Sequence, residues 1–148
     1  MVERAIRGLD LNALIRAREK RRVTRADLAR VTGLSTSTIQ KWESGATSPN
    51  IETLAKAAAA LGVPIRQLIK VPPSRRTLTD WRHLAGLSQT KLARAAGLTT
   101  PALAALERGE TQLTDDKADR ISPHLNATHD QLQAAWQRAK DRPPGAPA

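Results

Sequence analysis

The chain has 148 residues, of which 40% are hydrophobic and 26% are charged, and its formal net charge is +10. This length fits one ordinary domain or two small ones, and the basic excess favours a polyanionic partner such as DNA, RNA or an acidic membrane, although a merely soluble basic protein remains open. Because the chain has no cysteine, disulfides, zinc fingers and thiol catalysis are excluded.

The first half of the chain is predicted to form five short helices. The first covers residues 11–20, and its helically spaced residues are Leu11, Leu14, Ile15 and Arg18. Residue types that favour helix ends mark the next three helices. These ends are Thr24 and Gly33 for residues 25–32, Ser35 and Gly45 for residues 36–44, and Asn50 and Gly62 for a helix that buries Ile51, Leu54, Ala58 and Leu61. Pro64 is expected at the first position of a fifth helix, with Ile65, Leu68 and Ile69.

The chain repeats itself at an offset of 64 residues, without a gap. The offset places Leu14 on Leu78, Arg18 on Arg82, Thr24 on Ser88, Gly33 on Gly97, Ile39 on Leu103, Glu43 on Glu107, Gly45 on Gly109 and Leu68 on Leu132. Matches of glycine, glutamate and apolar residues continue at this single offset over most of each half, which chance rarely produces. The second half is therefore predicted to be another copy of the same helical unit.

Prolines mark the joint between the copies and the end of the chain. Two prolines in residues 72–76 forbid a continuous helix and stiffen the joint, so this segment is predicted to be the linker. Residues 141–148 contain three prolines and a glycine and are predicted to be a disordered tail. The predicted domains are therefore residues 9–71 and residues 77–140.

Residues 24–63 resemble the helix-turn-helix domains of the Cro and phage-repressor family, also called XRE-like. The residues that carry the resemblance are Thr24, Leu28, Ala29, Gly33, Ser35, Ile39, Trp42, Glu43, Gly45 and Pro49. The match covers essentially all of residues 9–71, and residues 88–128 resemble the family as well. The resemblance implies an all-α fold of two tandem five-helix lambda-repressor-like DNA-binding domains. It also implies that Arg18 pairs with Glu43, and Arg82 with Glu107, to join helices.

The helix over residues 36–44 is expected to read bases in the major groove, which admits an α-helix. Leu28 and Ala29 must face Ile39 and Trp42, so the polar side chains of this helix point outward. The base-reading candidates are Thr36, Ser37, Gln40 and Lys41. Lysine can donate to guanine, glutamine can pair with adenine, and the threonine methyl can contact thymine.

A second set of residues is expected to contact the DNA backbone. Its members are Thr24, Arg25, Ser35, Ser44, Thr47, Ser48 and Asn50. Arg25 departs from the family, which often has glutamine there, and the arginine strengthens phosphate attraction. The basic run Arg16, Arg18, Lys20, Arg21 and Arg22 fits phosphate contact and a solvated face equally well.

The second copy keeps the helix ends and the core positions of the first, but its third helix has fewer side chains that could contact bases. Thr100, Pro101, Ala104 and Ala105 replace the four base-reading candidates, and alanine offers no hydrogen bond to a base. One interpretation is weak DNA binding, which would make the chain a pseudo-dimer; its candidates are Gln89, Lys91, Arg94, Thr99, Thr100 and Arg108. The favoured interpretation is a protein contact for dimerisation. Trp136 fits an interface or, preferably, the core of this copy.

No pattern in the chain indicates catalysis, a cofactor or a metal site. The histidines, at positions 83, 124 and 129, are expected on the surface. The opening residues lack the apolar run of a signal peptide, and the longest apolar stretch, around residues 57–63, is too short to span a membrane. We therefore expect a cytoplasmic, nucleoid-associated protein with no membrane partner.

These observations predict a transcriptional regulator that binds specific double-stranded DNA. A repressor from a phage, plasmid or other bacterial element is favoured, acting as a homodimer or as a pseudo-dimeric monomer. One alternative is the antitoxin of a toxin–antitoxin pair, which would use the same fold. Another is a protein-interaction module that has lost DNA binding.

Overall fold

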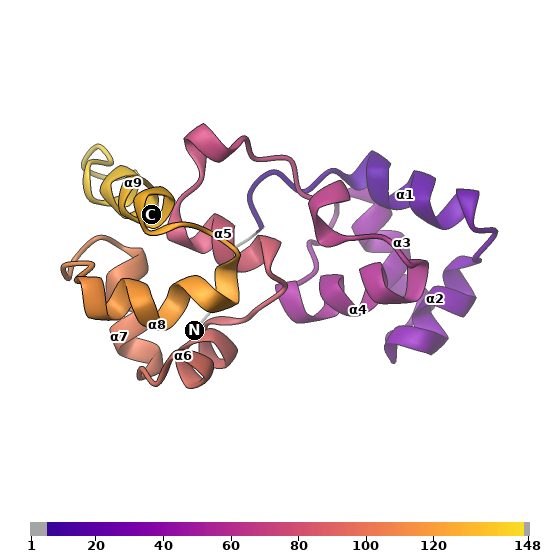
Figure 1. Cartoon of the computed structure of the whole chain (residues 1–148). Coiled ribbons are helices and arrows are strands. Elements are labelled where there is room, and N and C mark those ends of the chain that lie inside the picture. The colour runs from indigo at the N-terminus through magenta and orange to yellow at the C-terminus, as the bar shows by residue number, and fades with distance from the viewer. Residues whose placement is uncertain (1–5, 147–148) are drawn as a thin grey trace. The chain divides into compact units, whose positions relative to one another are not determined.

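The protein is described here by a computed structural model, which covers residues 6–146. The chain divides into two compact units, which we call the N-terminal unit (Met1–Lys70) and the C-terminal unit (Val71–Ala148). Within residues 6–146 every regular element is helical, apart from one isolated bridge between Leu9 and Ile69 (Figure 1). The predicted all-α fold is therefore confirmed. None of these helices is long and apolar enough to cross a membrane.

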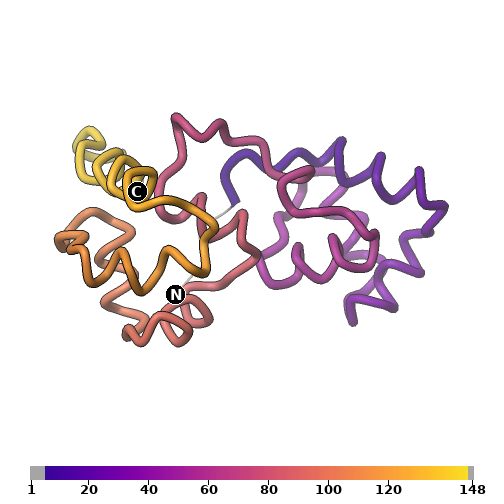
Figure 2. The backbone as a smooth tube through the Cα atoms, in the orientation of Figure 1, coloured from indigo at the N-terminus to yellow at the C-terminus, as the bar shows by residue number. Residues whose placement is uncertain are grey.

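The described part of the N-terminal unit contains four α-helices at the predicted positions. They are α1 (Leu11–Lys20), α2 (Arg25–Thr32), α3 (Thr36–Ser44) and α4 (Ile51–Leu61). The side chains of the residues that precede them accept hydrogen bonds from the first turns, as capping predicts; these residues are Asp10, Thr24, Ser35 and Asn50. Gly33 has a φ of +75°, which lets the chain reverse between α2 and α3. Figure 2 shows the short coils and tight turns that result.

The prediction of a fifth α-helix in the N-terminal unit was wrong in length and start. The element is a single 3-10 turn, η1 (Ile65–Gln67), and Pro64 precedes it with extended backbone angles. The helix does not continue because residues 68–70 pair with residues 8–10: the Asp10 amide donates to the Leu68 carbonyl at 2.8 Å, and Leu9 and Ile69 form the bridge. Leu68 and Ile69 are nevertheless buried as expected, in the core with Leu14 and Leu61.

The described part of the C-terminal unit contains five α-helices. After the 3-10 turn η2 (Pro73–Arg75) come α5 (Leu78–Leu84), α6 (Gln89–Ala96), α7 (Thr100–Glu107), α8 (Asp115–Leu125) and α9 (His129–Lys140). Trp136 on α9 is 4% exposed and lies in the core, and its indole N–H donates to the carbonyl of Thr111 at 2.9 Å. A Cβ at Gly109 would lie 2.6 Å from the backbone nitrogen of Lys140, so glycine permits this close approach of α9.

The predicted linker, residues 72–76, is folded against its own C-terminal unit. The Arg76 guanidinium lies 4.5 Å from the ring centroid of Trp81, and its Nε donates to the Val71 carbonyl at 2.9 Å. Arg138 on α9 donates in turn to the Arg76 carbonyl at 2.6 Å. Before the linker, at the end of the N-terminal unit, the Lys70 amide donates to the Gly8 carbonyl at 2.7 Å within that unit. The segment is therefore held by specific contacts as well as by its prolines.

Replacing Arg138 by alanine is expected to loosen this segment. Loss of a hydrogen bond of about 1 kcal/mol makes local opening about 5-fold more frequent, and proteolysis follows the open population. Trypsin should then cleave after Arg75 and Arg76 about 5-fold faster, as followed by mass spectrometry. Lys140→Ala is the control, because it removes a cation from α9 but leaves the bond to Arg76 intact. Equal cleavage of the two variants would contradict the role of Arg138.

Candidate nucleic-acid interface

The polar side chains of α3 form one exposed face. Thr36, Ser37, Gln40 and Lys41 are all exposed, as predicted for base-reading residues. The opposite side of the helix anchors it, since Ile39 is fully buried and Trp42 is 3% exposed. The packing of α3 against α2 thus sets which side chains are presented to a partner.

Three of the predicted backbone-contact residues already use their side chains as helix caps. The oxygens of Thr24, Ser35 and Asn50 accept from the amides of Asp27, Thr38 and Thr53, respectively, at 2.9–3.1 Å. A phosphate at these positions would therefore meet backbone N–H groups of the first helical turn rather than a free side-chain acceptor.

The turn after α3 brings the remaining polar candidates together. Ser44 Oγ donates to the Lys41 carbonyl at 3.1 Å, so this hydroxyl folds back onto the helix. Thr47 and Ser48 are exposed, and the amide of Thr47 donates to the same carbonyl at 3.3 Å. The two hydroxyls of Thr47 and Ser48 are therefore the side-chain donors that this turn offers to a phosphate.

Glu43 joins the first three helices through two arginines. Its carboxylate accepts Arg18 Nε at 2.6 Å and Nη2 at 3.0 Å, which confirms the predicted pair. Arg25 Nε donates to the same carboxylate at 2.9 Å, a contact that the sequence reasoning did not assign. Burial raises the pKa of Glu43, but the hydrogen bonds from Arg18 and Arg25 outweigh it and hold the pKa below its usual value.

The basic run at the end of α1 does not act as one surface. Arg18 is used by Glu43, Arg21 donates to the Gly62 carbonyl at 3.2 Å, and Arg16 lies 4.0 Å from Asp10. The side chains of Lys20 and Arg22 are exposed and make no hydrogen bond or ion pair to another described residue. The positive φ of Arg22, 57°, belongs to the tight turn between α1 and α2.

The corresponding face of α7 in the C-terminal unit is small and partly covered. Ala104 is 8% exposed, Thr100 and Ala105 are half-buried, and only Pro101 is exposed among the four residues that replace the base-reading set. This face has no long polar side chain that could reach a base edge.

Among the other DNA-contact candidates of the C-terminal unit, some side chains are hydrogen-bonded to a glutamate and others are exposed. Gln89 Nε2 donates to Glu107 Oε1 at 3.0 Å, and Arg108 pairs with Glu110 through two hydrogen bonds of 2.9 and 3.0 Å. Lys91 and Arg94 are exposed on α6, Thr99 is the cap of α7, and Thr100 follows it. The hydrogen bond from Arg108 lowers the pKa of Glu110, so this carboxylate stays ionised beside the turn.

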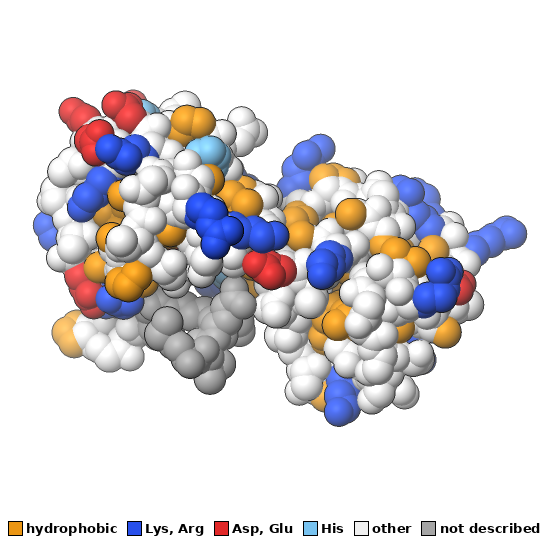
Figure 3. Space-filling view, turned by 90° about the horizontal axis from the view of Figure 1, so that it is seen from below, with side chains coloured by type: hydrophobic (Ala, Val, Ile, Leu, Met, Phe, Trp, Pro, Cys, Tyr) orange, Lys and Arg blue, Asp and Glu red, His pale blue; other side chains and the backbone are white. Residues whose placement is uncertain are grey.

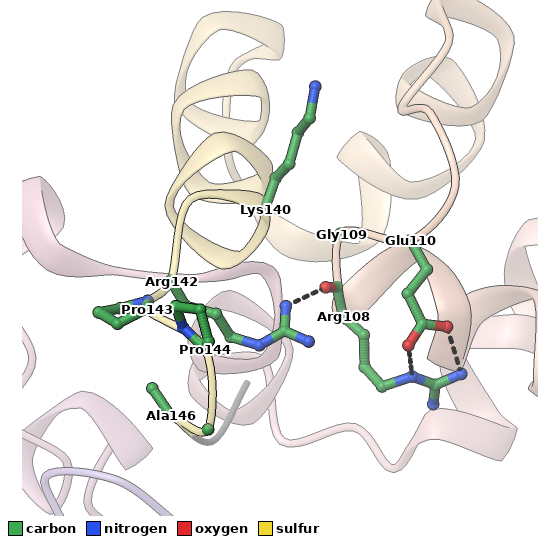
Figure 4. A pocket seen from close by; sticks show the side chains of 9 residues that line it. Arg108, Gly109, Glu110, Lys140, Arg142, Pro143, Pro144 and Ala146 are labelled. Carbon is green, nitrogen blue, oxygen red and sulfur yellow. Dashed lines mark hydrogen bonds and ion pairs between the residues drawn. The ribbon is translucent and has the colours of Figure 1, made fainter.

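The C-terminal tail borders a hollow of about 330 Å³ beside the same turn (Figure 4). Arg142 donates to the carbonyls of Arg108 and Ala139, the latter at 2.7 Å. Residues 143–146 turn back through a bond from the Ala146 amide to the Pro143 carbonyl, and residues 147–148 of the predicted tail lie outside the described residues. No sequence pattern indicated these contacts, because they join segments that the repeat does not relate.

Charge is distributed unevenly along the chain. Residues 1–71 hold 13 basic and 6 acidic residues, whereas residues 72–148 hold 11 and 8. On the face shown in Figure 3, the Asp and Glu side chains gather mainly on the C-terminal unit, at the left. Among the described residues no group of three or more His, Asp or Glu could hold a metal ion.

The histidines do not all lie on the surface, so that expectation was wrong for His83. This side chain is 2% exposed on α5, a helix that also buries Leu78 and Trp81. His124 and His129 are exposed as predicted, and His129 Nε2 lies 2.9 Å from a carboxylate oxygen of Asp119. The short, heavily buried α5 leaves little room for a surface-facing residue at position 83.

Comparison with known proteins gives one match per unit. A family model described as Helix-turn-helix matches residues 14–68 and again residues 78–132. A search of curated proteins found no match. The two matched segments start 64 residues apart, which is the offset of the internal repeat.

Proposed function

From the premise that the chain belongs to the helix-turn-helix family and is a DNA-binding regulator of the XRE type, we propose that it is a repressor that reads the major groove with α3. The observation that carries this proposal is the exposed polar row on α3, formed by Thr36, Ser37, Gln40 and Lys41. A good bidentate contact to a base gives about 1–3 kcal/mol of discrimination.

The proposed backbone contacts flank this row on both sides. They comprise the capped start of α2 with Thr24 and Arg25, the cap Ser35, and the turn that carries Ser44, Thr47, Ser48 and Asn50. Helix starts present unpaired backbone N–H groups, which suit phosphate oxygens. The net positive charge of the N-terminal unit supports its approach to DNA.

We assign the C-terminal unit mainly to a protein contact, with α7 joining two copies of the chain. The small apolar face of α7 and the acidic residues that follow it support this assignment, because neither suits a phosphate-lined groove. A homodimer would place two α3 helices on half-sites about one helical turn apart, roughly 34 Å.

The decisive experiment is selection of bound duplexes from a random pool, followed by footprinting on the selected site. The proposal expects one enriched, palindromic sequence with half-sites about 10 base pairs apart. A longer, asymmetric footprint would favour a monomer that uses both units. Failure to enrich any sequence, with low retention on DNA at low salt, would overturn the proposal in favour of an interaction module. Co-purification of a small toxin would indicate an antitoxin.

Replacing Ala105 by lysine is expected to weaken self-association. The residue is half-buried on α7, and a charged side chain cannot enter an apolar contact without losing its hydration. Analytical ultracentrifugation should show at least a 10-fold rise in the dimer dissociation constant, from a penalty of about 1.4 kcal/mol or more. Ala95→Lys, at an exposed position of α6, is the control. An unchanged dimer in Ala105→Lys would exclude α7 as the interface.

A further inference from the structure

Among residues 6–146, three arginines bind a glutamate through the same edge of the guanidinium, which is formed by Nε and Nη2. They are Arg18 with Glu43, Arg82 with Glu107 and Arg108 with Glu110, at 2.6–3.1 Å. This planar fork matches two oxygens of a carboxylate or of a phosphate. An arginine that is held in place while this edge makes no contact within the protein is therefore equipped to bind such an oxyanion.

Arg142 is an arginine of this kind. It is half-buried, and its Nη1 donates to the carbonyls of Arg108 and Ala139, the latter at 2.7 Å. These carbonyls lie at the ends of α7 and α9, where a cation is favoured, so they explain how the guanidinium is held. Its Nε and Nη2 make no hydrogen bond or ion pair to any other residue in the described part of the chain. The neighbouring carboxylate, that of Asp141, accepts from Gln137 at 2.9 Å instead.

The hollow beside the C-terminal tail is lined by this guanidinium. In Figure 4 the side chain of Arg142 reaches from the tail toward the turn that follows α7. The hollow has a volume of about 330 Å³, which lies at the lower end of the range of about 300–1,000 Å³ for small-molecule sites. Pro143, Pro144 and Ala146 also line it and provide apolar surface. The lining thus combines a cation with surface that suits a small organic group.

The charge that faces this hollow is positive. The guanidinium of Arg108 is neutralised by Glu110 through two hydrogen bonds. Lys140 also lines the hollow, but Figure 4 shows its ammonium group turned away from Arg142, and this group lies 5.2 Å from the ring centroid of Trp136. The surplus charge at the hollow is therefore that of Arg142, which has no carboxylate partner within residues 6–146.

We propose that the hollow binds a small organic oxyanion, a carboxylate or a phosphate monoester, on the Nε–Nη2 edge of Arg142. The apolar side chains of the tail contact the organic part of this ligand. The N-terminal unit has no equivalent site, because a single 3-10 turn stands there in place of α9. The C-terminal unit thereby gains the means to sense a metabolite. The hollow shares no residue with the exposed row of α3, so this inference and the proposed function can fail separately.

Amide NMR spectra of the whole chain test the site with two probes, succinate and methyl phosphate, titrated at constant ionic strength. The signals of Gly109 and Gly145, which both line the hollow, should shift and reach saturation with at least one probe. Saturation by succinate alone assigns a carboxylate ligand, and saturation by methyl phosphate alone assigns a phosphate monoester. Shifts that stay linear in probe concentration and spread over both units would show screening of surface charge and would overturn the inference.

Two substitutions on opposite sides of the hollow should change the affinity in opposite directions. Arg142→Gln keeps an amide donor for the two carbonyls but loses the charged fork, so the affinity should fall at least 10-fold. Glu110→Gln removes a negative charge from the lining and leaves the tail unaltered, so the affinity should rise about 5-fold. Arg66→Gln is the matched control, because it removes the same charge from an exposed position of the N-terminal unit and should change nothing.

The variants also separate ligand binding from a purely structural role of Arg142. A structural role alone predicts that Arg142→Gln displaces the Gly145 signal before any probe is added, and that Glu110→Gln leaves the affinity unchanged. Equal affinity of the wild type and Arg142→Gln, or no gain in Glu110→Gln, would therefore overturn the assignment of the site.

Discussion

Replacing Glu107 by alanine is expected to destabilise the C-terminal unit by about 3–5 kcal/mol, enough to unfold a marginally stable domain. Glu107 neutralises Arg82, whose side chain is 3% exposed, and it also accepts hydrogen bonds from Thr79 and Gln89. Alanine would leave a buried guanidinium with neither a counter-charge nor acceptors for two of its N–H groups. Urea denaturation in a Trp42→Phe background, in which Trp81 and Trp136 of the C-terminal unit supply the fluorescence, measures the loss.

Glu110→Ala is the control for this substitution, since it removes an exposed carboxylate three residues further along the chain and should change stability little. Glu43→Ala should cost less than Glu107→Ala, because Arg18 is 11% exposed and can regain some hydration. If Glu107→Ala were no more destabilising than Glu110→Ala, Arg82 would have to reach solvent on its own, and the buried pair would not hold these helices together.

The helices were predictable from sequence wherever local chemistry determines their ends. Capping residues and left-handed glycines act within a few residues, so the predicted bounds of α2 and α3, near 25–32 and near 36–44, agree with those observed. The fifth helix of the N-terminal unit was predicted wrongly because Pro64 and the apolar residues after it do not reveal a backbone pairing with a distant segment. In the C-terminal unit α9 runs without interruption from His129 to Lys140, whereas residues 68–70 pair with residues 8–10 and leave only one 3-10 turn in the N-terminal unit.

The candidate site was predictable only in part, for a physical reason. Helical periodicity determines which side chains leave the core, so the exposure of Thr36, Ser37, Gln40 and Lys41 followed from sequence. Pairing between helices depends on their three-dimensional crossing, so the bond from Arg25 to Glu43 did not follow. The repeat does give one indication of this bond, because the equivalent positions 25 and 89 both carry a side chain with N–H donors.

Replacing Lys41 by alanine is expected to remove discrimination at one base pair of the DNA site, at a cost of about 1–3 kcal/mol on the preferred sequence. Lys41 is exposed on α3, and its ammonium group has no hydrogen bond or ion pair to another residue in the described part of the chain. A contact to guanine would thus cost the free protein no internal interaction. Affinity for the selected duplex should fall about 5-fold to 150-fold, and a duplex changed at the contacted pair should bind both proteins alike.

Lys56→Ala on α4 is the matched control, because it removes the same charge from an exposed helix position outside the α3 row. It should preserve the ranking of all duplexes. If Lys41→Ala instead weakened every duplex by one factor and lowered the slope of log affinity against log salt by about 0.9, Lys41 would bind phosphate. Base reading would then depend on Thr36, Ser37 and Gln40, whose shorter or neutral side chains discriminate through hydroxyl, methyl and amide contacts. Specificity would in that case rest on several weak contacts, and no single substitution in α3 would abolish it.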